Sequence, residues 1–305
     1  MIPASGESEE SGNAIGLASD GSTKFGGDER SNSTSSANKN NLASQERILS
    51  GHHDPRQRKT YLVLLSFTVL SAISGLALLF VWMFQFRPVN GIGIENAGQL
   101  ANLHPLMMYT FMVSLNMYAV LVYRTHFNQP KQSLKWIHAI LAGGNIVMSL
   151  LGVFAMFKSH LMAGIPNFYS LHSWIGAITN IFYLSQFVVG FVAFMKPGLA
   201  QHRRASIMPW HRFCGAALLV LAALAAITGI TELVIFQDKN GAYSNFMPIT
   251  FIANAAGLSV VAMTALSIYL LAAPQYIRPP LLEEAPLKAE FKKRADAAAT
   301  TGLRD

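Results

Sequence analysis

The chain has 305 residues, of which 51% are apolar and only 13% are charged, and its mean hydropathy is +0.33. This composition excludes an ordinary soluble domain, in which about a quarter of the residues are charged, and the single Cys214 excludes an internal disulfide framework or a cysteine-based metal cluster. The formal net charge of +7 comes from lysines and arginines beside apolar stretches, which is typical of membrane proteins, so we do not expect nucleic-acid binding.

The first 58 residues are rich in Ser, Gly, Asn, Glu and Lys. Such a segment cannot bury enough apolar surface to offset its ordering entropy, so we predict a disordered tail over residues 1–58. No apolar core follows the initiator methionine, so the tail does not have the pattern of a signal peptide.

Six apolar stretches follow, each close to or longer than the roughly 20 residues that cross a bilayer as a helix. They cover about 61–86, 103–124, 136–158, 168–195, 208–236 and 248–273. The pattern predicts an all-α membrane protein with a six-helix transmembrane domain over 59–275 and a tail over 276–305. Pro105 and Pro209 are expected in the first turn of their helices, where a missing N–H has no cost.

The loops predict the orientation in the membrane. The loop 125–135 carries Lys131 and Lys135 without an acidic residue, and the loop 196–207 carries three cations without one. The loops on the other face are nearly balanced in charge. The positive-inside rule therefore predicts that both termini and these two cationic loops are cytosolic.

Four histidines, His104, His138, His172 and His211, lie near the starts of apolar stretches. Because consecutive helices run in opposite directions, His104 and His172 are expected on the outer side, and His138 and His211 on the cytosolic side. Two pairs of this kind suit two stacked bis-histidine haems, whose filled axial positions favour electron transfer. Zinc would require three or four ligands at one point.

Two other interpretations of the membrane histidines remain open. A single histidine can be a hydrogen-bonded core residue, and a set of histidines can be the proton relay of a proton-coupled transporter without haem. Transporters usually contain internal repeats and discontinuous helices, and the sequence around the histidines shows no convincing repeat.

Cations are aligned with both cytosolic histidines. Lys131, Lys135 and His138 are related as i, i+4 and i+7, on one face of a helix, and Arg204 precedes His211 by seven residues. Haem propionates or an acidic small molecule would suit this cluster. The alternative is that these are ordinary positive-inside charges.

The chain resembles the cytochrome b561 family, in its ascorbate-dependent ferric reductase branch. The Tyr-Ser-Leu-His-Ser-Trp run at 169–174 is the most specific match. The other matches are His104-Pro105-Leu106-Met107, Lys131 with Lys135, Ile137-His138-Ala139, Arg204 with Met208-Pro209-Trp210-His211, and Gly229 with Thr231-Glu232.

The resemblance implies that the second to fifth helices form a core around two b haems. His104 and His172 would be the axial ligands of the outer haem, and His138 and His211 those of the inner haem. Beside the outer haem it places Asn167, Phe168, Tyr169, Ser170 and Glu232, and beside the inner haem propionates Arg124 and Lys131.

The resemblance also implies the substrates. Lys131, Lys135 and Arg204 would bind cytosolic ascorbate, and His160 would meet an outer acceptor, either a ferric chelate or monodehydroascorbate. The expected activity is therefore a transmembrane ascorbate-dependent oxidoreductase, most simply an ascorbate ferrireductase, with regeneration of vesicular ascorbate as the alternative. A homodimer in the plasma membrane or in an endosomal, lysosomal or secretory vesicle membrane would fit the family.

Overall fold

The computed structural model describes residues 55–196, 198–238, 247–278 and 281. Every regular element in these ranges is a helix, and six helical spans are long and apolar enough to cross a membrane. The chain is thus an all-α, multi-pass integral membrane protein, which confirms the predicted fold class. Residues 1–54 of the predicted N-terminal tail and 282–305 of the predicted C-terminal tail lie outside the described residues.

Four of the six spans are single helices, and the other two combine α-helical with π-helical segments. In chain order the elements are α2 (Pro55–Val81), η1 (Trp82–Phe86), α3 (Ala97–Met107), η2 (Met108–Leu115), α4 (Asn116–Thr125), α5 (Lys131–Ala163), α6 (Leu171–Phe194), α7 (Gln201–Gln237), α8 (Pro248–Ala272) and η3 (Pro274–Tyr276). The two π-helices, η1 and η2, continue the first span and interrupt the second.

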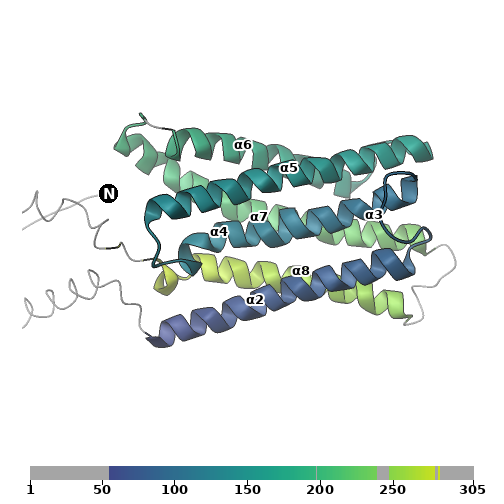
Figure 1. The fold of residues 1–305 in the computed structure, drawn as a ribbon, viewed down its shortest axis with the longest axis horizontal. Helices are drawn as coiled ribbons and strands as arrows, with labels where there is room; N and C mark the ends of the chain where they lie inside the picture. Colours follow the sequence, from purple (N-terminus) through teal and green to yellow (C-terminus); the bar gives the residue numbers. More distant parts are fainter. Residues whose placement is uncertain (1–54, 197, 239–246, 279–280, 282–305) are drawn as a thin grey trace, which may run out of the picture. The chain divides into compact units, whose positions relative to one another are not determined.

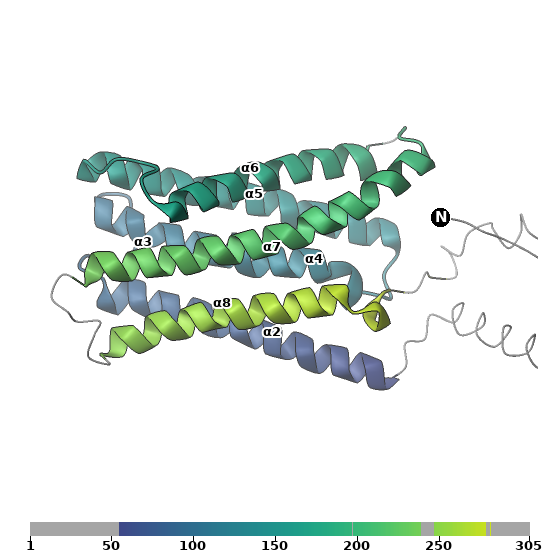
Figure 2. The ribbon, with the colours of Figure 1, turned by 180° about the vertical axis from the view of Figure 1, so that it is seen from behind.

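The spans run lengthwise beside one another, and consecutive spans point in opposite directions (Figure 1). We call the end where α2, α5 and α7 begin the proximal end, and the end where α3, α6 and α8 begin the distal end. Helix α5 contacts α3, η2, α4 and α6, and α6 packs along α7. Helices α2 and α8 pair with each other beside this group, as the view from behind shows (Figure 2).

Apolar side chains cover the outside of the bundle as well as its interior. Phe67, Leu161 and Phe251 are 57%, 81% and 60% exposed, whereas Trp82 and Leu121 in the main apolar cluster are fully buried. In a soluble protein such a surface would be a large interaction patch. On six long apolar helices it is the surface that faces lipid.

The helices extend further than the apolar stretches indicate. Helix α5 begins at Lys131 and α7 at Gln201, well before the predicted starts at 136 and 208, because polar first turns protrude from the apolar band. The expectation that Pro105 and Pro209 occupy first turns is wrong, since both lie inside their helices. Neighbouring helices in a membrane bundle make such interior prolines tolerable.

The buried side chain of Asn102 organises the first distal loop. Its Nδ2 donates to the carbonyl oxygens of Val89 and Gly91, both at 2.7 Å, and its Oδ1 accepts from Arg87 Nε at 2.6 Å. Burial lowers the pKa of the Arg87 guanidinium. One amide thus holds the loop that follows η1 against α3, two residues before His104.

Candidate functional site

The structure brings the four histidines together as two pairs. The ring centres of His104 on α3 and His172 on α6 are 6.0 Å apart at the distal end, with the ring planes at 85°. Those of His138 on α5 and His211 on α7 are 6.1 Å apart at the proximal end, at 79°. A metal ion about 2 Å from one nitrogen of each ring would hold the ring centres about 6 Å apart, so both gaps suit one axially ligated metal.

Backbone carbonyls orient three of the four imidazoles. The Nδ1–O distances are 2.9 Å for His104 to Gly152, 2.7 Å for His138 to Ala119 and 2.8 Å for His172 to Ala225. A carbonyl oxygen only accepts, so each of these Nδ1 atoms carries the proton and each Nε2 keeps a lone pair for a metal. The buried Nδ1 of His211 has no hydrogen-bond partner.

A glycine makes room for one imidazole of each pair. A Cβ on Gly190 of α6 would lie 2.8 Å from Cε1 of His211, and one on Gly229 of α7 would lie 2.7 Å from Cε1 of His172. The contact between α6 and α7 is therefore reciprocal, because each helix carries a histidine that lies against a glycine of the other. The imidazoles occupy the space that a larger side chain would fill.

The two pairs lie at different depths in the bundle. On α5, the proximal ligand candidate His138 is 14 residues before Gly152, whose carbonyl orients the distal His104. At 1.5 Å per residue these levels are about 21 Å apart, which is most of the thickness of a bilayer core.

The predicted cationic residues gather at the proximal end. Lys135 Nζ donates to the carbonyl oxygen of Phe194 at 3.4 Å, and Arg204 Nε donates to that of Leu199 at 2.8 Å. Lys131 and Arg204 are close enough to Lys135 for their charges to act on it. Lys131 is exposed, whereas Lys135 and Arg204 are half-buried. The cluster thus presents positive charge to an anion at this end.

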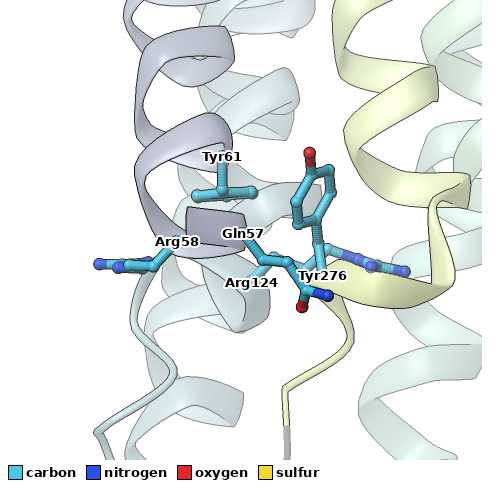
Figure 3. A pocket seen from close by; sticks show the side chains of 5 residues that line it. All are labelled: Gln57, Arg58, Tyr61, Arg124 and Tyr276. Carbon is cyan, nitrogen blue, oxygen red and sulfur yellow. The ribbon is translucent and has the colours of Figure 1, made fainter. Parts of the chain in front are cut away.

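Arg124 has a structural role that the sequence does not reveal. Its buried guanidinium donates to the carbonyl oxygen of Ala273 at 2.7 Å and to that of Leu271, at the end of α8. It also lines a pocket of about 10 Å³ together with Arg58 and Tyr61 (Figure 3). These contacts cap α8, and the expected place of Arg124 beside the haem propionates stays a prediction.

A cavity of about 290 Å³ lies beside His172 at the distal end, between α6 and α7. Tyr169 Oη donates to Glu232 Oε1 at 3.1 Å in its wall, and the other carboxylate oxygen of Glu232 is buried without a partner. Burial and the adjacent Glu232 carboxylate raise the pKa of Tyr169 to about 12. Ser170 caps the first turn of α6 beside the same cavity through a capping box with Ser173.

The remaining distal candidates meet around the loop between α5 and α6. His160 Nδ1 lies 3.0 Å from Asn167 Oδ1, and the His160 ring is 6.2 Å from that of Tyr169. Phe168 has a φ of 58°, a left-handed conformation that is strained for a bulky residue. Its carbonyl accepts from Trp174 Nε1 at 2.9 Å, which fixes the loop.

Among the described residues, no three or more histidine, cysteine or acidic side chains form a group that could hold a metal ion. The zinc alternative therefore has no ligand set in this part of the chain. The two imidazole pairs, with oriented rings and glycines beside them, have the donor set and spacing of bis-histidine haem sites.

The family model for eukaryotic cytochrome b561 matches residues 103–237, which contain all four paired histidines. A transmembrane ascorbate-dependent reductase of Ovis aries is 34% identical over 227 residues, which cover 74% of this chain and 88% of that protein. Transmembrane ascorbate ferrireductase 2 of Arabidopsis thaliana is 34% identical over 187 residues (61% and 81%), and ascorbate-specific transmembrane electron transporter 1 of Zea mays is 34% identical over 211 residues (68% and 88%). The chain belongs to the cytochrome b561 family.

Proposed function

We propose that this protein carries electrons across a membrane, from ascorbate at the proximal end to a ferric chelate at the distal end, by way of two b haems. The observation that carries the proposal is the pair of imidazoles at each of two depths, with ring centres 6.0 and 6.1 Å apart. The names of the relatives, which specify an ascorbate-dependent reductase and an ascorbate ferrireductase, support the donor and the acceptor.

Membership of the family implies b-type haem, which supplies a reversible one-electron iron couple when bound. His104 and His172 would hold the distal haem, and His138 and His211 the proximal one. With two imidazoles to hold each haem, neither site would bind oxygen or substrate at the iron. Gly190 and Gly229 let two of these rings lie tightly between α6 and α7.

The proximal cations would bind the donor. Ascorbate is a monoanion at neutral pH, and Lys131, Lys135 and Arg204 attract and orient it beside the His138–His211 pair. Their loops carry the excess of positive charge, so the positive-inside rule supports a cytosolic position for this end and for both termini. An electron that moves outward through a negative-inside membrane is favoured by ~2.3 kcal/mol per 100 mV.

The distal loop would receive the acceptor. His160, with its ring held by Asn167, lies next to Tyr169, which lines the cavity beside His172. An imidazole at this position suits a ferric chelate as a weak ligand or hydrogen-bond donor. Monodehydroascorbate is the alternative acceptor, and either fits a homodimer in the plasma membrane or in a vesicle membrane.

Haem content of single His→Ala variants tests the haem sites. The purified wild-type protein should show a b-type spectrum with two haems per chain. His104→Ala and His172→Ala should lose the same haem, and His138→Ala and His211→Ala the other. A wild-type protein without a haem spectrum would favour a proton-coupled transporter, and loss of one common haem in His104→Ala and His138→Ala would overturn the pairing.

Reduction kinetics test the donor site. Lys131→Ala/Lys135→Ala should raise the ascorbate concentration for half-maximal reduction by about tenfold or more, because each charge-assisted contact contributes about 1.5–3 kcal/mol. Lys158→Ala, at the distal end, is the matched control and should not change it. Equal half-saturation in the double variant and the wild type would contradict the donor site.

The acceptor is tested with His160→Ala, assayed with a ferric chelate and with monodehydroascorbate. Selective loss of ferric reduction would support the ferrireductase, and selective loss of monodehydroascorbate reduction would support ascorbate regeneration. Equal rates with both acceptors in His160→Ala and the wild type would remove His160 from the acceptor site.

A further inference from the structure

The second membrane span is a π-helix over its middle third. Between α3 and α4, the eight residues of η2 (Met108–Leu115) make wider turns than an α-helix. Segments of this kind are rare and often occur at functional sites. Here η2 lies between two positions that belong to different haem sites in the function proposed above. This inference rests on that proposed function.

Those two positions are His104 and Ala119. His104 precedes η2 and belongs to the distal pair, whereas Ala119 follows η2 and its carbonyl orients His138 of the proximal pair. Each residue that a π-helix adds to a helix rotates everything after it by about 100°, since an α-helix has 3.6 residues per turn. The geometry of η2 therefore sets the direction in which the Ala119 carbonyl points relative to His104.

The amide of Asn145, on α5, bonds across the end of η2. In the amide orientation that satisfies both of its ends, its Nδ2 donates to the carbonyl oxygen of Phe111 at 3.2 Å, and its Oδ1 accepts from the backbone N of Asn116 at 3.3 Å. The Asn116 N–H is shared between the carbonyl oxygens of Phe111, which is the π-helical bond, and Val113. Asn145 therefore bonds to both partners of the backbone bond that closes the π-turn.

Asn145 is fully buried, and apolar Ala142, Ile146 and Phe187 belong to the adjacent cluster. In the same amide orientation, Tyr183 Oη of α6 donates to the amide oxygen of Asn145 at 3.2 Å. On α5, Asn145 lies seven residues after His138 and seven before Gly152, midway between the levels of the two pairs. A side-chain amide at such depth is costly unless it is hydrogen-bonded, and here its partners are η2 and Tyr183.

We propose that Asn145 is a positioning residue for the proximal haem. By holding Phe111 and Asn116 in the π-turn, it keeps the Ala119 carbonyl on Nδ1 of His138 and so fixes the plane of that axial imidazole. Ala119 is only three residues from Asn116, whereas His104 is two turns before Phe111, on a segment that Asn102 holds separately. Loss of the Asn145 amide should therefore disturb the proximal site and leave the distal one.

The test is a redox titration of full-length protein in lipid nanodiscs, followed by haem absorbance and electron paramagnetic resonance. The proximal haem is the signal that His138→Ala removes. In Asn145→Leu this signal should shift, and its equilibrium constant for reduction should change at least threefold, which is about 30 mV for one electron. The distal signal should stay as in the wild type. Ser149→Ala is the matched control, because Ser149 is also buried on α5 but bonds only within its own helix, to Ile146.

Tyr183→Phe tests whether the bond from Tyr183, rather than the bonds to η2, is responsible for the effect of Asn145. This variant removes the Tyr183 hydroxyl of α6 and keeps both bonds of Asn145 to η2. It should shift the proximal signal less than Asn145→Leu does, and an equal shift would overturn the proposal. If the wild type holds two haems and Asn145→Leu leaves the proximal signal as unchanged as Ser149→Ala does, the proposal is also overturned. A wild type without haem would instead refute the proposed function.

A further variant applies if Asn145→Leu fails to insert or fold. Deletion of Ser114 in that background shortens η2 by one residue and lets the span become a regular α-helix with the later register kept. This deletion should restore both haems. Failure to restore them would overturn the role of Asn145 in holding the π-turn.

Discussion

The four paired histidines are held in two different ways. His104, His138 and His172 each donate to a helix carbonyl, whereas the Nδ1 of His211 has no partner and its ring lies 5.2 Å from that of Phe194 and against Gly190. Packing alone therefore orients His211. Substitution of a single residue beside a ring should accordingly change haem binding at the proposed sites.

Gly229→Ala tests this packing. The added Cβ would lie 2.7 Å from Cε1 of His172, too close for an atomic contact, so the imidazole must turn away. We expect loss of about half of the bound haem in this variant, all from the site that His172→Ala abolishes, measured by pyridine haemochrome assay. Gly176→Ala, where a Cβ would meet nothing within 4 Å, should keep the wild-type content. Full content in Gly229→Ala would contradict the packing argument.

Tyr169 should titrate far above the ordinary range for a phenol. Burial and the Glu232 carboxylate raise its pKa from 10.0 to about 12, so the folded protein binds this proton more tightly than the unfolded chain does. Its contribution to stability is present below pH 10 and is lost between pH 10 and about 12. The ultraviolet titration of the wild type minus that of Tyr169→Phe should show this step near pH 12. In Glu232→Gln the step should move to lower pH, and an unmoved step would exclude Glu232 as a cause.

At the scale of elements, irregular segments position the site together with the regular helices. The π-helix η2 sets the register between the two histidine levels, and the loop after η1 is fixed by one asparagine, Asn102. The loop between α5 and α6 is fixed by Trp174 and by the left-handed Phe168. The regular helices set the depth of the histidines in the bundle, and these irregular segments set how the chain beside them is rotated.

Asn102→Leu should release the first distal loop. It removes the partner of Arg87 and leaves the part-buried carbonyls of Val89 and Gly91 without this donor, at a cost below the roughly 1–3 kcal/mol of a fully buried unsatisfied group. The melting temperature of the detergent-solubilised protein should fall by several degrees. Asn180→Leu is the control, because Asn180 bonds only to Gly176 in its own helix. Equal melting temperatures for the two variants would contradict the role of Asn102.

The depth of the four histidines could be predicted from the sequence, and the orientation of their rings could not. Apolar length gives six spans, and their alternating direction places His104 with His172 and His138 with His211. Neither pattern identifies Ala119 and Gly152 as the backbone acceptors, because every residue has a carbonyl group. Nor does periodicity reveal η2 or the interior Pro105, since both depend on packing by neighbouring helices.

At the scale of the whole molecule, the two ends of the bundle differ in charge. The proximal end presents Lys131, Lys135 and Arg204, whereas the distal cavity carries the carboxylate of Glu232 next to Tyr169. In the proposed function, this asymmetry would give the bundle a donor side for anions and a separate acceptor side. The direction of electron flow in the proposed function therefore depends on how the chain is inserted.

Insertion is tested with epitope tags placed at the two termini. Both should be inaccessible to antibody or protease in intact cells, and accessible once the plasma membrane alone is permeabilised, because the positive-inside rule predicts a cytosolic position for the cationic loops. Reversing the charge of Lys131, Lys135 and Arg204 to Glu should reduce the uniformity of this orientation. Tags exposed on intact cells would reverse the proposed direction of transfer.

The carbonyls that orient His104, His138 and His172 have an evolutionary consequence. A codon change can replace the side chain of Gly152, Ala119 or Ala225, but it cannot remove the main-chain oxygen that fixes the imidazole tautomer. These acceptors are lost only if a whole helix shifts or turns. The orientation of three of the four paired imidazoles is thus protected from point mutation of its acceptor, and it depends instead on the residues that keep the helices in register.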